Sequence, residues 1–169
     1  RFADAFRRLT ASAVQQYRLR YILAKLTQHV ELRAYGETAT TKWLAHYADS
    51  KFEIEHIYPQ HPSPEAHDEF GPTKNQQVAD RVGNLLLVEK SINASLGNRP
   101  FSAKREVYQQ SQLLLTRAIA ERPRIGANTR IDAAVAQLEP YPEWNEAAVN
   151  RRQELIGRLA CSVWNVPVR

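Results

Sequence analysis

The stretch Ile54-Glu55-His56-Ile57-Tyr58-Pro59-Gln60, with Phe52 and Glu53 before it, determines how the rest of the chain is interpreted. Apolar and acidic side chains alternate up to Glu55, and a period of two is typical of a short β-strand. Proline cannot donate a hydrogen bond to a strand ladder, so Pro59 marks the end of the strand. We therefore predict a strand that ends with a carboxylate, Glu55, beside an imidazole, His56.

A second strand and a short helix are predicted downstream. The apolar run Val82-Gly83-Asn84-Leu85-Leu86-Leu87-Val88 predicts the strand. Ser91 is a typical helix N-cap, and Gly97 with Asn98 closes the helix that it opens. Residues 58–77, which separate the strands, are rich in proline and polar side chains and predict a long loop. The expected order is strand, loop, strand, helix.

The flanking segments are predicted to be helical. Apolar side chains recur every three or four residues from Leu19 to Val30, which is one face of an amphipathic helix. Further helices are expected near residues 2–9, near 43–47, over 102–121 and 128–138, and after an Asn145 N-cap. Large aromatic side chains at helical spacing are expected in the core; these are Tyr17, Tyr21, Trp144 and Trp164.

Together these elements predict one α+β domain that is mostly helical. Its core, residues 51–101, holds the two strands and the short helix, with N-terminal helices in 1–50 and C-terminal helices in 102–169. A length of 169 residues and 43% hydrophobic composition allow a real core. The first residue is arginine, and we expect the chain to be the C-terminal fragment of a longer protein.

Charge and cysteine content narrow the class of partner. The net charge is +5, and residues 81–130 hold nine basic against three acidic residues, which is compatible with a polyanionic partner. The single cysteine excludes an internal disulfide and suits a reducing cytoplasm. Apolar runs are too short for a membrane span, so we expect a cytoplasmic location and no membrane partner.

Glu55, His56, Asn84 and Asn93 are the side chains that a one-metal phosphodiesterase requires. A histidine with an ordinary pKa near ~6.5 can accept a proton from the attacking water. One divalent cation can neutralise the developing charge, and carboxylate and amide oxygens suit Mg²⁺ or Mn²⁺. Adjacent strand residues point to opposite faces, so Glu55 and His56 can converge only where the strand ends and twists.

The same residues carry a family resemblance. Glu55-His56-Ile57-Tyr58-Pro59-Gln60 resembles the first half of the HNH (His-Me finger, ββα-metal) nuclease motif, and Gly83-Asn84-Leu85 resembles its middle asparagine. Asn93 resembles the final residue, on the helix. Residues 91–101 with Lys104, Tyr108 and Ser111 are similar to the C-terminal nuclease domain of GmrSD-type modification-dependent restriction proteins, as are residues 17–23 and 144–164.

The resemblance implies specific roles. His56 would be the general base, Asn84 would brace the loop and orient His56, and Asn93 would complete the catalytic set. Glu55 and Asn93 would hold Mg²⁺ or Mn²⁺, although many HNH sites have aspartate where Glu55 stands. Asn98 is the alternative amide ligand. Four basic residues are expected to contact the DNA backbone: Lys90, Arg99, Lys104 and Arg105.

The implied function is a metal-dependent DNA endonuclease, nicking or cutting, that serves as the effector of a bacterial restriction and anti-phage system. The implied partner is a ParB-like nucleotide-hydrolysing sensor domain, N-terminal in the same full-length chain. Two other classes stay open. One is a degenerate HNH fold that binds DNA without cutting it. The other is an interaction domain whose helices dock a partner protein, with the charge only conferring solubility.

Overall fold

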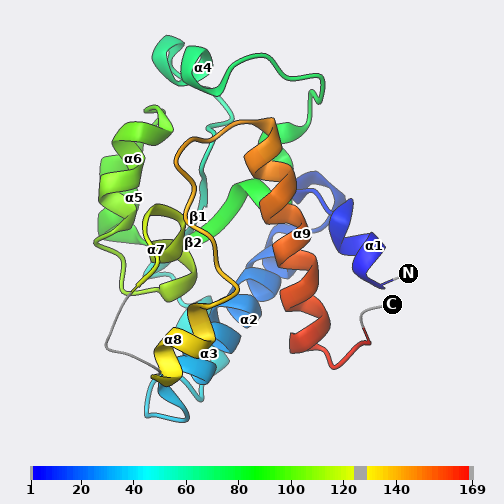
Figure 1. Ribbon diagram of the computed structural model, residues 1–169, viewed down its shortest axis with the longest axis vertical. Helices are drawn as coiled ribbons and strands as arrows, with labels where there is room; N and C mark the ends of the chain where they lie inside the picture. The colour runs from blue at the N-terminus through cyan, green and yellow to red at the C-terminus, as the bar shows by residue number, and fades with distance from the viewer. Residues whose placement is uncertain (1, 124–128, 168–169) are drawn as a thin grey trace.

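The computed structural model describes residues 2–123 and 129–167, and its centre is a two-stranded antiparallel sheet (Figure 1). Strand β1 (Phe52–His56) pairs with β2 (Leu85–Glu89) so that Phe52 lies opposite Glu89 and His56 opposite Leu85. Helices surround this sheet. The predicted class, a mostly helical α+β fold, is confirmed.

The two faces of the sheet pack into two separate apolar clusters. Leu85 and Leu87 join the larger cluster, which is built mainly from the N-terminal and C-terminal helices. Leu86 and Val88 point the other way, into a cluster with Trp144 and Tyr108. Because β2 is covered on both faces, its sequence is a continuous apolar run rather than an alternating one. The predicted second strand begins later than expected, since residues 82–84 form a 3₁₀ turn, η3 (Val82–Asn84).

The N-terminal layer consists of α1 (Phe2–Arg7), η1 (Ala11–Ala13), α2 (Gln16–Tyr35) and α3 (Leu44–Ala48). The predicted apolar face of α2 is buried, as expected. Tyr17 and Tyr21, expected in the core, are instead 64% and 45% exposed. They are one helical turn apart and lie off the buried stripe of α2, so their spacing indicated a helix face but not which face was covered.

The segment between the strands is not the structureless loop that was predicted. It contains α4 (Pro64–Phe70) and η2 (Val78–Asp80). The Ser63 side chain accepts a hydrogen bond from the Ala66 N–H, and Pro64 occupies the first turn, where its missing N–H has no cost. Gly71 ends the helix with φ = 76°. These local signals outweigh the proline content that suggested a loop.

The predicted helix over 102–121 is also wrong, because the chain forms two helices there. After α5 (Lys90–Leu96) come α6 (Phe101–Tyr108) and α7 (Leu114–Ala120). Glu89, at the end of β2, accepts hydrogen bonds from Ser111 Oγ at 2.9 Å and from Gln112 N at 2.7 Å. This tertiary contact turns the chain where sequence spacing alone predicted continuity.

The C-terminal part follows the prediction more closely. Thr129 and Asp132 form a capping box at the start of α8 (Arg130–Val135). The Asn145 side chain caps α9 (Glu146–Val163) as predicted. The expected start, at residue 128, of the helix predicted over 128–138 lies outside the described residues. Within residues 2–123 and 129–167, no helix combines the length and apolar character needed to cross a membrane.

Candidate functional site

The end of β1, the turn after α5 and one side of α6 enclose a cavity of about 150 Å³. Glu55 and His56 both line it, so these two adjacent residues meet at one cavity at the end of β1, as the sequence predicted. The remaining lining residues come from the loop after β1, from the turn after α5 and from α6; they are Pro59, Gln60, His61, Gly97, Asn98 and Lys104.

His56 presents a neutral imidazole with one uncommitted nitrogen. Its Nε2 atom is buried without a hydrogen-bond partner among the described residues, and the Asp80 Oδ1 atom is 3.9 Å away. Burial lowers the pKa of His56; the Asp80 carboxylate raises it, and the Lys104 charge lowers it further. The imidazole is therefore deprotonated at neutral pH, which is the form that can accept a proton.

Glu55 forms a buried ion pair with Lys104. Lys104 Nζ donates to Glu55 Oε1 at 2.6 Å and to the His56 carbonyl at 2.9 Å, and the Tyr108 hydroxyl donates to the same Oε1 at 3.2 Å. Burial raises the pKa of Glu55 and lowers that of Lys104, and each charge partly offsets the effect on the other. The expectation that Lys104 lies on a DNA-binding surface is wrong, because its side chain is fully buried.

Asn84 is completely buried and uses its whole amide group to fix the turn after His56. Its Oδ1 accepts from Tyr58 N at 2.8 Å and from Trp144 Nε1 at 2.9 Å. Its Nδ2 donates to the carbonyls of Tyr58 and Ala79, each at 2.8 Å. Because the Asn84 carbonyl also accepts from the N–H of Ile57, the chain on the C-terminal side of His56 is held by both the backbone and the side chain of Asn84.

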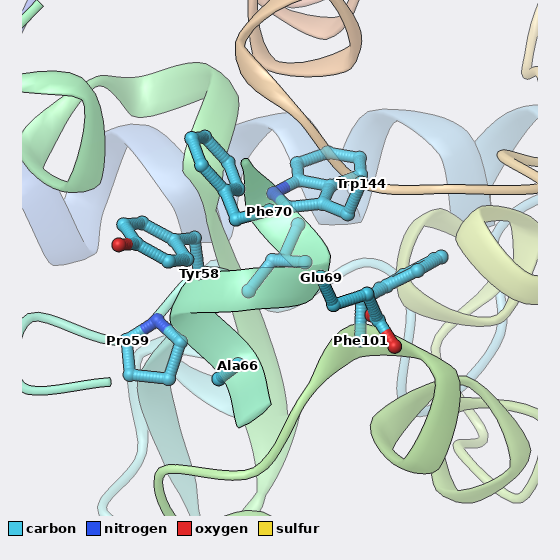
Figure 2. A pocket seen from close by; sticks show the side chains of 8 residues that line it. Tyr58, Pro59, Ala66, Glu69, Phe70, Phe101 and Trp144 are labelled. Carbon is cyan, nitrogen blue, oxygen red and sulfur yellow. The ribbon is translucent and has the colours of Figure 1, made fainter. Parts of the chain in front are cut away.

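The turn that follows β1 rests on an aromatic platform (Figure 2). The rings of Tyr58 and Phe70 stack with centroids 3.9 Å apart. In Figure 2, Pro59 lies beside Ala66 of α4. Tyr58 lies on one side of Phe70 and Trp144 on the other. Thus α4, absent from the sequence prediction, supports the turn that carries the candidate catalytic strand end.

The two candidate amide ligands lie in different places. Asn93, on α5, donates its Nδ2 to Glu53 Oε2 at 2.6 Å and is not among the residues lining the cavity. Asn98 does line it, one residue beyond the α5 cap at Gly97, where φ is 54°. No role was predicted for Glu53, yet the period of two in β1 places it on the same strand face as Glu55.

The other expected DNA contacts differ in their surroundings. Lys90 and Arg99 are exposed. Arg105 is half-buried, and its Nε donates to the Ala120 carbonyl at 3.2 Å. Arg105 therefore belongs to the packing between α6 and α7, on a different side of α6 from Lys104.

Donor chemistry at the cavity fits a hard divalent cation bound by few protein groups. Glu55 and Asn98 both line the cavity, a carboxylate and an amide are ligand types that suit Mg²⁺, and Mg²⁺ commonly takes one or two carboxylates with water and phosphate oxygens. Among the described residues, no group of three or more His, Cys, Asp or Glu side chains is arranged around a common ion position.

A comparison with known families gives a match. The model of the family described as GmrSD restriction endonucleases, C-terminal domain, matches residues 1–159. The matched range includes both strands, the cavity between β1 and α6, and most of α9. A comparison with curated proteins gives no match.

Proposed function

The chain belongs to the family of GmrSD restriction endonuclease C-terminal domains, a restriction-type nuclease domain, and we propose that it is an HNH-type endonuclease that hydrolyses DNA phosphodiester bonds with a divalent metal. The observation that carries this proposal is the convergence of His56 and Glu55 on one cavity at the end of β1. A neutral imidazole and a carboxylate are the groups that metal-assisted hydrolysis needs there.

His56 acts as the general base. Its lowered pKa keeps the imidazole neutral at physiological pH, and a neutral imidazole at the cavity can accept the proton of an attacking water. Asn84 holds the turn after His56 through Tyr58 and so limits how far the strand end can move. Its role is therefore to position the base, which matters because small displacements reduce proton transfer strongly.

Glu55 and Asn98 would hold Mg²⁺ or Mn²⁺. When bound, the ion supplies positive charge to the phosphate and the leaving oxygen. Lys104 and Tyr108 fix the Glu55 carboxylate through Oε1, so that its orientation is set before any substrate arrives. Asn93 keeps a supporting role in this proposal, because its amide holds Glu53 on the same face of β1.

The biological setting follows from the family. We propose that the domain is the effector of a bacterial system that restricts modified DNA, attached to an N-terminal ParB-like nucleotide-hydrolysing domain in a longer chain. The exposed Lys90 and Arg99 are proposed to contact the DNA backbone near the cut.

One observation favours a second candidate, a DNA-binding module that does not cleave. The Glu55 carboxylate is already neutralised by the ammonium of Lys104, 2.6 Å away, and a cation must compete with that charge. If the competition fails, DNA binds but is not cut. A cleavage assay separates the two candidates directly.

The decisive experiment compares plasmid cleavage by the wild type, His56→Ala and His67→Ala. His67 is a matched control because its side chain is 68% exposed and lies outside the cavity. With Mg²⁺ or Mn²⁺ the wild type should nick or linearise supercoiled plasmid, and chelator should abolish this. His56→Ala should lower the rate by ~10²–10⁴-fold, the usual contribution of a positioned general base. His67→Ala should cut at the wild-type rate.

The pH profile provides an independent check. Because the pKa of His56 is lowered from 6.5, the cleavage rate should rise with pH and reach its plateau below the pH at which an ordinary histidine would. If the His56→Ala variant cleaves plasmid at the wild-type rate and keeps the wild-type melting temperature, His56 is not the general base. Absence of cutting by the wild type under all metal conditions, with DNA binding intact, would favour the binding module.

A further inference from the structure

A second cavity, of about 480 Å³, lies between α6, α7 and the segment that leads into α9. Three arginines line it: Arg105 from α6, Arg117 from α7 and Arg122 just beyond α7. The other lining residues are Ala120, Glu121 and Pro140. Since Glu121 is the acidic member of this set, the ionised side chains that line the cavity carry a net charge of +2.

The arginines are oriented by backbone carbonyls, which accept hydrogen bonds but do not neutralise charge. Arg105 Nε donates to the Ala120 carbonyl at 3.2 Å. Arg122 donates through Nε and Nη2 to the Leu138 carbonyl at 3.4 and 3.2 Å. Among the described residues, Arg117 Nε is buried without a hydrogen-bond partner. None of the three forms a salt bridge with a carboxylate in the part of the chain that the structure describes.

Three guanidinium groups line one cavity without forming a salt bridge among the described residues, and an anion in the cavity would be attracted by the net positive charge of its lining. The planar guanidinium fork matches the oxygens of a phosphate group and can bind two of them at once. The cavity is also open to solvent and large enough for one phosphodiester and part of its sugars. Its chemistry therefore suits a phosphate group that arrives from solution.

We propose that this cavity binds a backbone phosphate of the DNA strand whose scissile phosphate lies in the cavity of His56. This inference rests on the proposed function, because it places both cavities on one substrate. Lys104 of the first cavity and Arg105 of the second are consecutive on α6, with Cα atoms about 3.8 Å apart. Their side chains leave the helix about 100° apart, so the two cavities share that helix. In this proposal, the DNA strand crosses α6 to reach both cavities.

The test measures DNA binding in EDTA, so that cleavage does not enter the result. Fluorescence anisotropy of a labelled duplex is recorded over a salt series for the wild type and for the variant Arg105→Gln/Arg117→Gln/Arg122→Gln. The matched control, Arg8→Gln/Arg18→Gln/Arg158→Gln, removes the same charge from exposed positions elsewhere. The cavity variant should bind at least ~10-fold more weakly than the control, and its logarithmic salt slope should fall by ~0.9 for each DNA phosphate that is no longer neutralised.

Equal affinities of the cavity variant and the control would overturn the proposal. The proposal would also be overturned if the cavity binds only small anions. In that case inorganic phosphate would raise the melting temperature of the wild type but not of the cavity variant. The cavity variant would then bind DNA with the same affinity as the control variant. Where the triple variant does not fold, the three single substitutions are compared, each expected to weaken binding ~2- to 5-fold beyond its exposed counterpart. Because binding is measured without metal, a failure of the wild type to cut DNA would leave this result unaffected.

Discussion

Lys104 and Glu55 form the most consequential contact at the scale of single residues. A buried ion pair contributes little net stability, because desolvation of both groups offsets their attraction. Removal of one partner has a large effect, because the remaining charge is left buried without its counter-charge. Here the pair also orients the carboxylate that would bind the metal, so its removal affects both stability and chemistry.

We predict that Lys104→Met lowers the free energy of unfolding by ~3–5 kcal/mol, because Glu55 is then buried without its counter-charge. The double variant Lys104→Met/Glu55→Gln should recover most of that stability. Urea denaturation at pH 7 measures both. The exposed Lys90→Met is the control and should change stability by less than about 0.5 kcal/mol. A single Lys104→Met variant as stable as the control would show that the pair is not buried in solution.

The site was only partly predictable from individual residues. The spacing around His56 identified Glu55, His56 and Asn84 as a set, and all three lie at or directly behind the strand end. Lys104 was expected to contact the DNA backbone, which requires a position on the surface, where most lysines lie. Its position inside the cavity depends on how α6 packs against β1, and a pattern within one segment does not contain that contact.

At the scale of elements, the end of α5 determines which asparagine faces the cavity. Asn93 and Asn98 are five residues apart, which on a continuous helix would point them in different directions. The helix instead stops at Leu96, and Gly97 redirects the chain with φ = 54°. Asn98 consequently reaches the cavity, while Asn93 stays against Glu53. The family resemblance favoured Asn93, with Asn98 as the alternative, but it did not account for this turn.

We predict that Asn98→Ala weakens Mn²⁺ binding by at least ~10-fold, a change comparable to the removal of a metal-site residue in other proteins. Asn93→Ala should stay within about 3-fold of the wild type, because it removes only the contact with Glu53. Isothermal titration calorimetry with Mn²⁺ distinguishes the two. The reverse order of effects would assign the amide ligand to Asn93.

Other elements show which parts of the secondary structure can be predicted from neighbouring residues in the sequence and which cannot. The strand at 52–56, the helix after Asn145 and the apolar stripe of α2 follow from period and capping alone. The break between α6 and α7 follows from the bonds of Glu89 to residues 111–112, which come from another element. Helix α4 was locally encoded by its Ser63 cap, but the prolines around it favoured a loop.

At the scale of the whole molecule, one acidic side chain is enclosed where α2 meets α7. Glu31 is 6% exposed, and its Oε1 accepts from the Leu114 N–H at 2.8 Å. Burial raises its pKa from 4.5 to about 7; the hydrogen bond from Leu114 opposes this rise, and the charge of Glu89 adds to it. The folded protein therefore holds a proton on Glu31 that the unfolded chain releases near its ordinary pKa.

This difference makes stability depend on pH in a definite direction. The folded pKa lies above the unfolded value, so the stabilising effect of the proton is fully present below about pH 4.5 and is lost as the pH rises through 7. Each pKa unit corresponds to ~1.4 kcal/mol, so the whole decrease amounts to roughly 3 kcal/mol at alkaline pH. Glu31 alone should thus make the fold less stable at pH 8 than at pH 5.

We predict that Glu31→Gln removes this component of the pH dependence. Glutamine keeps an oxygen that can accept from Leu114, but it cannot ionise in the interior. Urea unfolding should therefore show little change at pH 5 and a gain of up to about 3 kcal/mol at pH 8. The exposed Glu37→Gln is the matched control, because it removes the same charge in solvent and should leave the profile close to that of the wild type. Parallel profiles for Glu31→Gln and the wild type would mean that water reaches Glu31 and that the interface between α2 and α7 opens in solution.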